Sequence, residues 1–146
     1  MDDALLYRYF GSKLDLFDTV YSRLVTDTVD AVPLDATDLP GYVGRLYDHY
    51  ADHPHIVRLT VWHQLERPDQ PLPDAVGAAT KKKIDNIAAA QKAGVLPPTL
   101  PPGEVLALIT HLSLINTPLG SAAEGAVDRD RRRALAVETT RSALAV

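Results

Sequence analysis

Apolar side chains recur along this chain at alternating steps of three and four residues, the spacing of one face of an α-helix. The clearest stripe consists of Leu14, Phe17, Tyr21, Leu24 and Thr28. No alternating apolar and polar run is long enough for a strand, so the pattern predicts an all-α protein. The same spacing predicts six helices after a short N-terminal piece, at residues 12–30, 38–52, 54–67, 74–93, 103–116 and 128–145.

Helix boundaries are marked by capping and helix-breaking residues. Ser12 and Asp15 have the spacing of a capping box at the start of the first predicted helix. Pro33 follows that helix, and Pro54 opens the third, because proline fits the first turn of a helix but not its interior. Gly94 stands where a helix C-terminus favours glycine. These signals support the predicted order of the elements.

The helix predicted at 103–116 has almost no polar face, and such a helix must be covered on most of its sides. One chain of this size cannot easily cover it. The last helix adds a narrower seam of small and apolar residues. We therefore expect a two-fold homodimer built on the last two helices. The residues expected in its interface are Leu108, Leu112, Ile115, Leu135, Thr139 and Ser142.

Composition and charge narrow the possible functions. The 146 residues fit one domain, and the absence of cysteine excludes disulfides and thiolate chemistry. No apolar stretch is long enough to span a membrane and no secretory leader opens the chain, so we expect a cytoplasmic protein. Residues 1–73 carry six basic and twelve acidic side chains, a net −6, against +2 for the remainder. An acidic first half is unsuited to binding the phosphate backbone of a nucleic acid.

No catalytic motif is present, so no catalytic residue, cofactor or enzymatic activity is expected. The group His49, Asp52, His53 and His55 has partial metal-ligand spacing, but Pro54 turns the chain within it and a solvated helix end is the better interpretation; no metal is expected. The run 81–83 of three lysines points around a helix in three directions, so these side chains are expected to be solvated.

A small-molecule cavity is expected among the helices at 38–52, 54–67, 74–93 and 103–116. All nine aromatic residues lie within the first 62 positions, and a few polar groups fall at core-facing spacing. The alternative is that the aromatic rings fill a tight core, and that His63 and His111 are ordinary core histidines. The expected ligand is small and apolar or aromatic. Its expected contacts are Tyr47, Tyr50, Trp62, His63, Asn86, His111 and Asn116.

The opening residues 5–17, LLYRYFGSKLDLF, resemble the end of the helix-turn-helix in bacterial regulators of the TetR/AcrR family. Eight positions match the pattern of that family: Leu6, Tyr7, Tyr9, Phe10, Ser12, Lys13, Leu16 and Phe17. The segment 90–96 (AQKAGVL), followed by Pro102-Gly103-Glu104, is similar to the connector before the last two helices in that family. The resemblance covers the whole chain, although only the first stretch is specific.

The resemblance implies a TetR-like C-terminal bundle without the first two helices of the DNA-binding head. Residues 1–11 would be a remnant of the recognition helix and 12–146 an effector-binding and dimerisation domain. By resemblance, Tyr7, Tyr9 and Lys13 match positions that contact DNA phosphates or flank the recognition helix, while packing is an equal alternative for Tyr7. The implied protein is a ligand-responsive repressor that binds operator DNA only in full-length form; the alternative is a helical dimer that binds a small molecule and has no DNA role.

Overall fold

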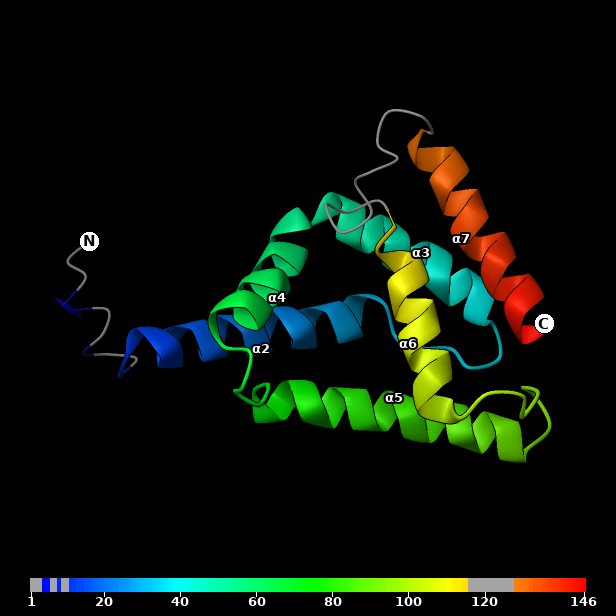
Figure 1. Cartoon of the computed structure of the whole chain (residues 1–146), viewed down its shortest axis with the longest axis horizontal. Coiled ribbons are helices and arrows are strands. Elements are labelled where there is room, and N and C mark those ends of the chain that lie inside the picture. The colour runs from blue at the N-terminus through cyan, green and yellow to red at the C-terminus, as the bar shows by residue number, and fades with distance from the viewer. Residues whose placement is uncertain (1–3, 6–7, 9–10, 116–127) are drawn as a thin grey trace.

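The computed structural model describes residues 4–5, 8, 11–115 and 128–146. Over these residues the chain is helical, without a strand, which confirms the all-α prediction (Figure 1). The helices are α2 (Lys13–Ala31), α3 (Leu39–Asp52), α4 (Pro54–Glu66), α5 (Asp74–Lys92), α6 (Pro102–Ser113) and α7 (Arg129–Leu144). None of them combines the length and apolar character needed to cross a bilayer.

The predicted capping box at the start of α2 is present. The Ser12 hydroxyl accepts the Asp15 backbone N–H at 3.1 Å, and the Asp15 carboxylate accepts the Ser12 N–H at 2.9 Å. The hydrogen bonds from Ser12 hold the pKa of Asp15 below its usual range. Gly11, at φ +87°, provides the sharp turn that enters the helix. The sequence therefore fixes this helix start by local chemistry.

Helix ends agree with prediction to within one residue except at α6, which ends at Ser113 instead of residue 116. There the backbone N–H of Leu114 donates back to the carbonyls of His111 and Leu112, closing the last turn. The apolar pattern continues past this point, and for that reason periodicity alone overextended the helix. Residue 116 itself lies outside the described residues.

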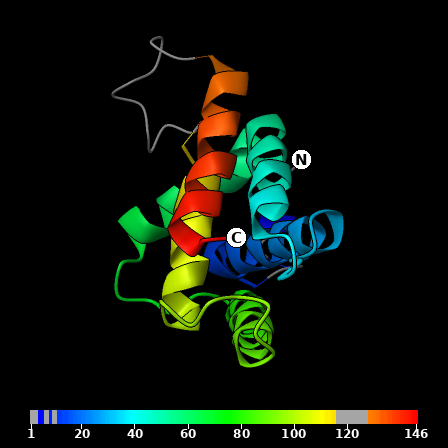
Figure 2. The same cartoon turned by 90° about the vertical axis from the view of Figure 1, so that its right-hand side faces the viewer.

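The larger core joins α3 to α6 and α7, and Figure 2 shows α3 and α7 side by side. Gly44 lies at the α3–α7 contact, where a Cβ would be 2.7 Å from Arg133 Nη2 and 3.2 Å from Val137 Cγ2. The missing side chain thus allows the close approach of the two helices. Twelve buried residues form the centre of this core: Val32, Leu39, Tyr42, Val43, Leu46, Ile87, Leu96, Val105, Leu106, Ile109, Ala136 and Leu144.

A second, smaller core holds α2 against α4 and α5. Phe17, Tyr21 and Val76 form its buried centre. The Arg67 guanidinium pairs with Asp18 at 2.8 Å, and the Tyr21 hydroxyl lies 2.9 Å from the Thr60 hydroxyl. Figure 1 shows α2 running out of this packed region toward the N-terminus, on the opposite side of the molecule from the C-terminus. The two cores therefore lie at different ends of the bundle.

Candidate ligand-binding cavity

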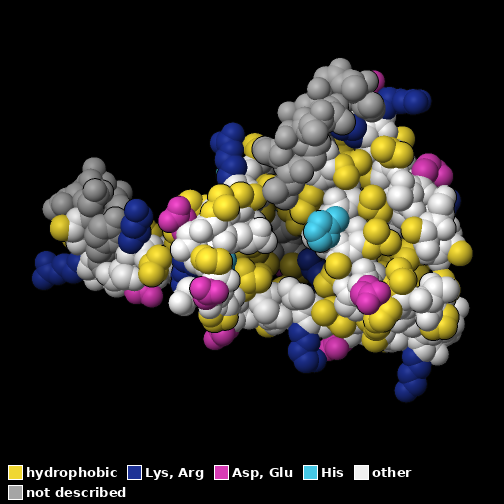
Figure 3. Space-filling model, in the orientation of Figure 1, with side chains coloured by type: hydrophobic (Ala, Val, Ile, Leu, Met, Phe, Trp, Pro, Cys, Tyr) yellow, Lys and Arg dark blue, Asp and Glu magenta, His cyan; other side chains and the backbone are white. Residues whose placement is uncertain are grey.

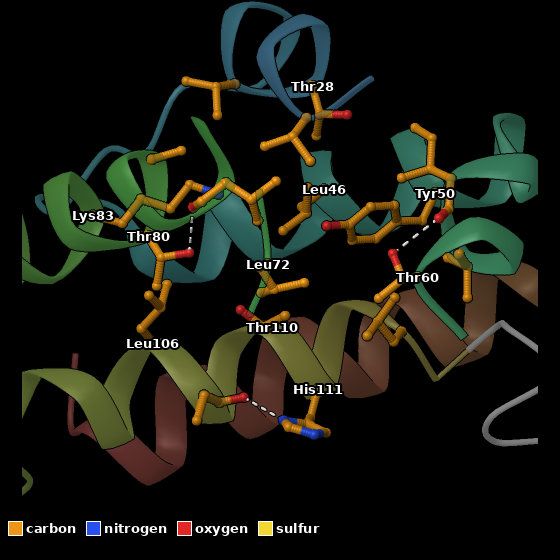
Figure 4. Close-up of a pocket in the computed structure, with 18 of the residues that line it drawn as sticks. Thr28, Leu46, Tyr50, Thr60, Leu72, Thr80, Lys83, Leu106, Thr110 and His111 are labelled. Atoms are coloured by element: carbon orange, nitrogen blue, oxygen red, sulfur yellow. Dashed lines mark hydrogen bonds between the residues drawn. The ribbon is translucent and has the colours of Figure 1, made fainter. Parts of the chain in front are cut away.

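A cavity of about 620 Å³ lies between the two cores and is bounded by α2, α3, α4, α5 and α6 (Figure 4). This volume is within the range of sites that hold drug-sized organic molecules. Most of the side chains around it are aliphatic. The lining residues are Tyr21, Val25, Thr28, Val29, Leu46, Tyr50, Ile56, Val57, Thr60, Val61, Gln64, Leu72, Val76, Ala79, Thr80, Lys83, Ile84, Gly103, Leu106, Ala107, Thr110, His111 and Leu114.

Helical periodicity explains why each helix contributes these positions. On α5 the lining includes Val76, Ala79 and Lys83, which follow the i, i+3, i+7 spacing of one face. On α6, Leu106 and Thr110 are one turn apart and face the same space. The cavity is thus a place where several helix faces meet without filling the volume between them.

Three of the hydroxyls in the wall already donate hydrogen bonds to backbone carbonyls of their own helices. Thr28 donates to the carbonyl of Leu24 at 2.8 Å, and Thr60 to that of Ile56 at 3.0 Å. Thr80 donates to a carbonyl one turn earlier, at 2.9 Å. Because the O–H of each of these hydroxyls already donates a hydrogen bond to the backbone, the oxygen can only accept a hydrogen bond from a ligand.

Other polar groups at the wall are not satisfied in this way. The Tyr50 hydroxyl, the Lys83 amine and the Thr110 hydroxyl have no hydrogen-bond partner within the part of the chain that the structure describes. Burial lowers the pKa of Lys83 from its ordinary value. Burial, with Tyr42 and Tyr21 nearby, raises the pKa of Tyr50, so its phenol remains protonated and able to donate. The cavity therefore offers several donors to a ligand.

His49 lies just behind the α2 wall. Its Nε2 is 3.2 Å from the hydroxyl of Thr28, and burial, followed by the neighbouring His53, lowers its pKa. The ring of His53 stacks on that of His49 at 4.4 Å. No group of three or more potential metal ligands comes together among the described residues. In this structure His49 connects α2 to α3.

The structure places two of the seven predicted ligand contacts, Tyr50 and His111, at the cavity wall. The Nδ1 of His111 bonds to the carbonyl of Ala107 at 2.7 Å, and its side chain is otherwise exposed. Tyr47 is fully buried on the other side of α3, where its hydroxyl donates to the Arg129 carbonyl at 2.8 Å. Tyr50 and Tyr47 therefore lie on different sides of α3, the first at the cavity and the second at the contact with α7.

Three of the remaining predicted contacts lie away from the cavity wall. Trp62 packs on Phe17 with ring centroids 4.6 Å apart and borders a smaller hollow of about 250 Å³ on α4. His63 is buried 5.8 Å from the same phenylalanine, and its Nε2 has no hydrogen-bond partner among the described atoms. Asn86 is exposed on α5, and Asn116 lies outside the described residues. These rings hold α2 to α4 and do not line the large cavity.

Sequence reasoning missed Lys83, which lines the cavity although its run of three lysines was expected to be solvated. The exposed neighbours Lys81 and Lys82 fit that expectation. A signal was present, because Lys83 is seven residues after Val76 and next to Ile84, on the apolar stripe of this helix. The contribution of α2 was also missed, since the predicted site began at the following helix.

Part of the surface over α6 and α7 is apolar, and Figure 3 shows hydrophobic side chains there. Leu135 is 60% exposed. Ser142 is exposed and Thr139 half-buried, while the three predicted interface residues of α6, or just after it, are half-buried against the larger core: Leu108, Leu112 and Ile115.

Of the three predicted DNA contacts, Lys13 is the first residue of α2 and is exposed. Tyr7 and Tyr9 lie outside the described residues. The structure therefore places one of these side chains, at the N-terminal end of the helix that borders the cavity.

Comparison with known proteins identifies the family. Residues 38–141 match the model of the tetracyclin repressor-like C-terminal domain. The HTH-type transcriptional repressor SCO4008 of Streptomyces coelicolor is 30% identical over 111 residues, 75% of this chain and 58% of that protein, so the chain spans less than two thirds of the relative. The crystal structure of SCO4942 from the same organism, described as a candidate transcriptional regulator, is 34% identical and has a TM-score of 0.80. The match covers 98% of this chain and 80% of that one. The chain belongs to the TetR family of transcriptional regulators.

Proposed function

We propose that this chain is the effector-binding and dimerisation part of a ligand-responsive TetR-type repressor that acts in the cytoplasm, by binding and not by catalysis. The observation that carries the proposal is the cavity of about 620 Å³, with α2 forming one of its walls. The matched family model and the repressor SCO4008 support the regulatory role. The effector is a small molecule with a mostly apolar body, as the aliphatic lining suggests.

The route from ligand to DNA would be α2. Tyr21, Val25 and Thr28 give this helix a face on the cavity, and its N-terminal end leads to the residues that resemble a helix-turn-helix. A ligand that fits one position of α2 better than another shifts the population toward that position. The difference in affinity is the whole of the coupling, typically about 1–3 kcal/mol between two sites.

Operator binding would belong to a form of the protein with a complete DNA-binding head. Residues 1–11 would then be the end of the recognition helix and supply Tyr7 and Tyr9 as contacts to the DNA backbone, and Lys13, at the start of α2, would supply a third. The net charge of −6 over residues 1–73 supports the view that this chain by itself holds DNA poorly.

Dimerisation would use α6 and α7 from each subunit. The exposed Leu135 and the half-buried Leu108 and Leu112 would meet the same surface of a second copy. A dimer of this kind fixes the distance between two heads, so that a movement of α2 in each subunit changes how both fit the operator.

The cavity can be tested with N-phenyl-1-naphthylamine, a neutral dye whose fluorescence rises in apolar surroundings. We expect one dye to bind per chain. Ala79→Trp places a large side chain at the lining, whereas Ala78→Trp places the same side chain on the exposed face one residue earlier. The first variant should weaken dye binding at least about tenfold because the volume is filled, and the second should leave it unchanged.

Circular dichroism and thermal melting would show that both variants remain helical and folded. Equal dye binding by the two variants would place the dye outside the cavity and contradict the proposal. A natural effector, once found, should show the same dependence and should also weaken operator binding by the full-length form.

A further inference from the structure

Lys83 is the only Lys, Arg, Asp or Glu among the described residues that line the cavity. Its neighbours on α5 differ: Lys81 pairs with Asp85 at 2.7 Å, and Lys82 is exposed. Lys83 makes no ion pair within the described part of the chain, and no carboxylate borders the cavity there to provide one. The cavity therefore contains a cation without a counter-ion.

Keeping an amine in apolar surroundings without a partner is unfavourable, because the group loses hydration and gains nothing in return. Burial accordingly lowers the pKa of Lys83. A methionine or leucine at this position would continue the apolar face of Val76 and Ile84. A residue that costs stability at a cavity wall is typical of a site that serves binding.

A second donor lies on the opposite wall. Figure 4 shows the side chains of Tyr50, from α3, and Lys83, from α5, extending toward the middle of the cavity. The phenol of Tyr50 has no hydrogen-bond partner among the described residues, and its raised pKa keeps the proton in place. An ammonium and a phenol are two hydrogen-bond donors, and together they suit the two oxygens of an anionic group such as a carboxylate.

The rest of the wall is suited to a different part of a molecule. Val25, Leu46, Val57 and Leu106 present aliphatic surface, and the threonine hydroxyls nearby are bonded to their own helices. Apolar contact with these side chains would hold a hydrocarbon or aromatic body. The cavity therefore has one polar region, at Lys83 and Tyr50, and an aliphatic lining over most of its other walls.

We propose that the effector is an amphipathic organic anion, whose acidic head binds the Lys83 amine and the Tyr50 hydroxyl while its apolar body fills the aliphatic part of the cavity. This inference rests on the proposed function of the cavity as the effector site, and adds the charge of the ligand to it. The acid is a carboxylate or a group of similar size and charge, because these accept both donors at once.

Two dyes that differ by one acidic group test the charge. 8-Anilinonaphthalene-1-sulfonate has the framework of N-phenyl-1-naphthylamine with a sulfonate added. Lys83→Met removes the amine and retains much of the length, and Lys82→Met makes the same change on the exposed face of α5. Lys83→Met should weaken sulfonate binding by about tenfold or more, and change binding of the neutral dye by less than about twofold. Lys82→Met should alter neither.

A competition measurement gives a second readout with natural head groups. Decanoate should displace the neutral dye from the unaltered chain at lower concentration than decanol does, and Lys83→Met should abolish that advantage. Lys83→Arg, which keeps the charge, should retain part of it. Retained binding of the neutral dye shows that each variant has kept its fold.

The outcomes separate this inference from the proposal on which it rests. If neither dye binds the unaltered chain, the cavity is not a ligand site and both fall. If the neutral dye binds and is blocked by Ala79→Trp, while Lys83→Met leaves sulfonate and decanoate binding unchanged, the effector site stands and the anionic effector is overturned. Equal weakening of both dyes by Lys83→Met would also overturn it, because it would show loss of shape and not of charge.

Discussion

Gly44 offers a sharp test of how closely α3 and α7 pack. Replacing a glycine inside a helix by alanine ordinarily stabilises the protein by about 1 kcal/mol, because alanine loses less backbone entropy on folding. At Gly44 the added Cβ would be 2.7 Å from Arg133 Nη2 and 3.2 Å from Val137 Cγ2. At Gly77, on α5, the added Cβ would have nothing within 4 Å. The two glycines therefore form a matched pair.

The contacts of the added Cβ decide whether Gly44→Ala stabilises or destabilises the fold. The Arg133 guanidinium can swing away, at the cost of its 2.9 Å ion pair with Asp48, which is partly exposed and contributes at most about 1 kcal/mol. The Val137 methyl is attached to a stiff side chain and must move with its helix; overpacking of this kind costs about 1–3 kcal/mol. We expect Gly44→Ala to destabilise the fold by about 1 kcal/mol and Gly77→Ala to stabilise it by about 1 kcal/mol.

Urea unfolding followed by circular dichroism measures both values, at one fixed protein concentration because dimerisation contributes to stability. For a chain of this size, the variants should melt roughly 3 °C below and above the unaltered protein. If Gly44→Ala stabilises the protein as much as Gly77→Ala does, the close approach of α3 and α7 is not set by the missing side chain. The double variant Gly44→Ala/Arg133→Met should recover only the part of the cost due to the guanidinium.

Three further outcomes follow from the structure. Leu135→Glu on α7 should weaken dimerisation as measured by sedimentation, whereas Leu65→Glu should not, although the Leu65 side chain on α4 is 75% exposed. Monomeric behaviour of the unaltered chain at tens of micromolar would refute the dimer. Because burial lowers the pKa of His49 below 6.5, the unfolded state binds its proton first, so the unfolding free energy should fall as the pH drops below about 6.5, less steeply in His49→Gln. The 146-residue chain should give no sequence-specific gel shift with operator DNA; a salt-sensitive specific shift would contradict this.

The helices could be predicted because the signals for them are local. Ser12 begins α2 through a hydrogen-bonded box within four residues, and proline and glycine mark most of the other ends. The end of α6 at Ser113 could not be predicted, since the apolar pattern continues beyond it. Hydrophobic spacing reports which residues avoid water, but not where the last helical hydrogen bond forms.

The site could be predicted only in outline, since an aromatic residue indicates burial but not which space it borders. Tyr47 and Tyr50 are three residues apart on α3, yet one is buried against α7 and the other faces the cavity. Trp62 fills the contact with α2. Which helix faces leave a void between them depends on how five helices cross, and no local pattern contains that information.

The placement of Lys83 shows how a cavity wall differs from a core at the level of single residues. A core excludes an amine, because dispersion contacts and burial favour an aliphatic side chain there. At Lys83 the helix retains an amine on its apolar face, while the adjacent hydroxyl of Thr80 is bonded to its own backbone. The threonine hydroxyls that donate to their own helices offer a ligand no hydrogen-bond donor, so they add little selectivity. Selectivity then depends on the few donors that the fold leaves without a hydrogen-bond partner, and on α5 that donor is Lys83.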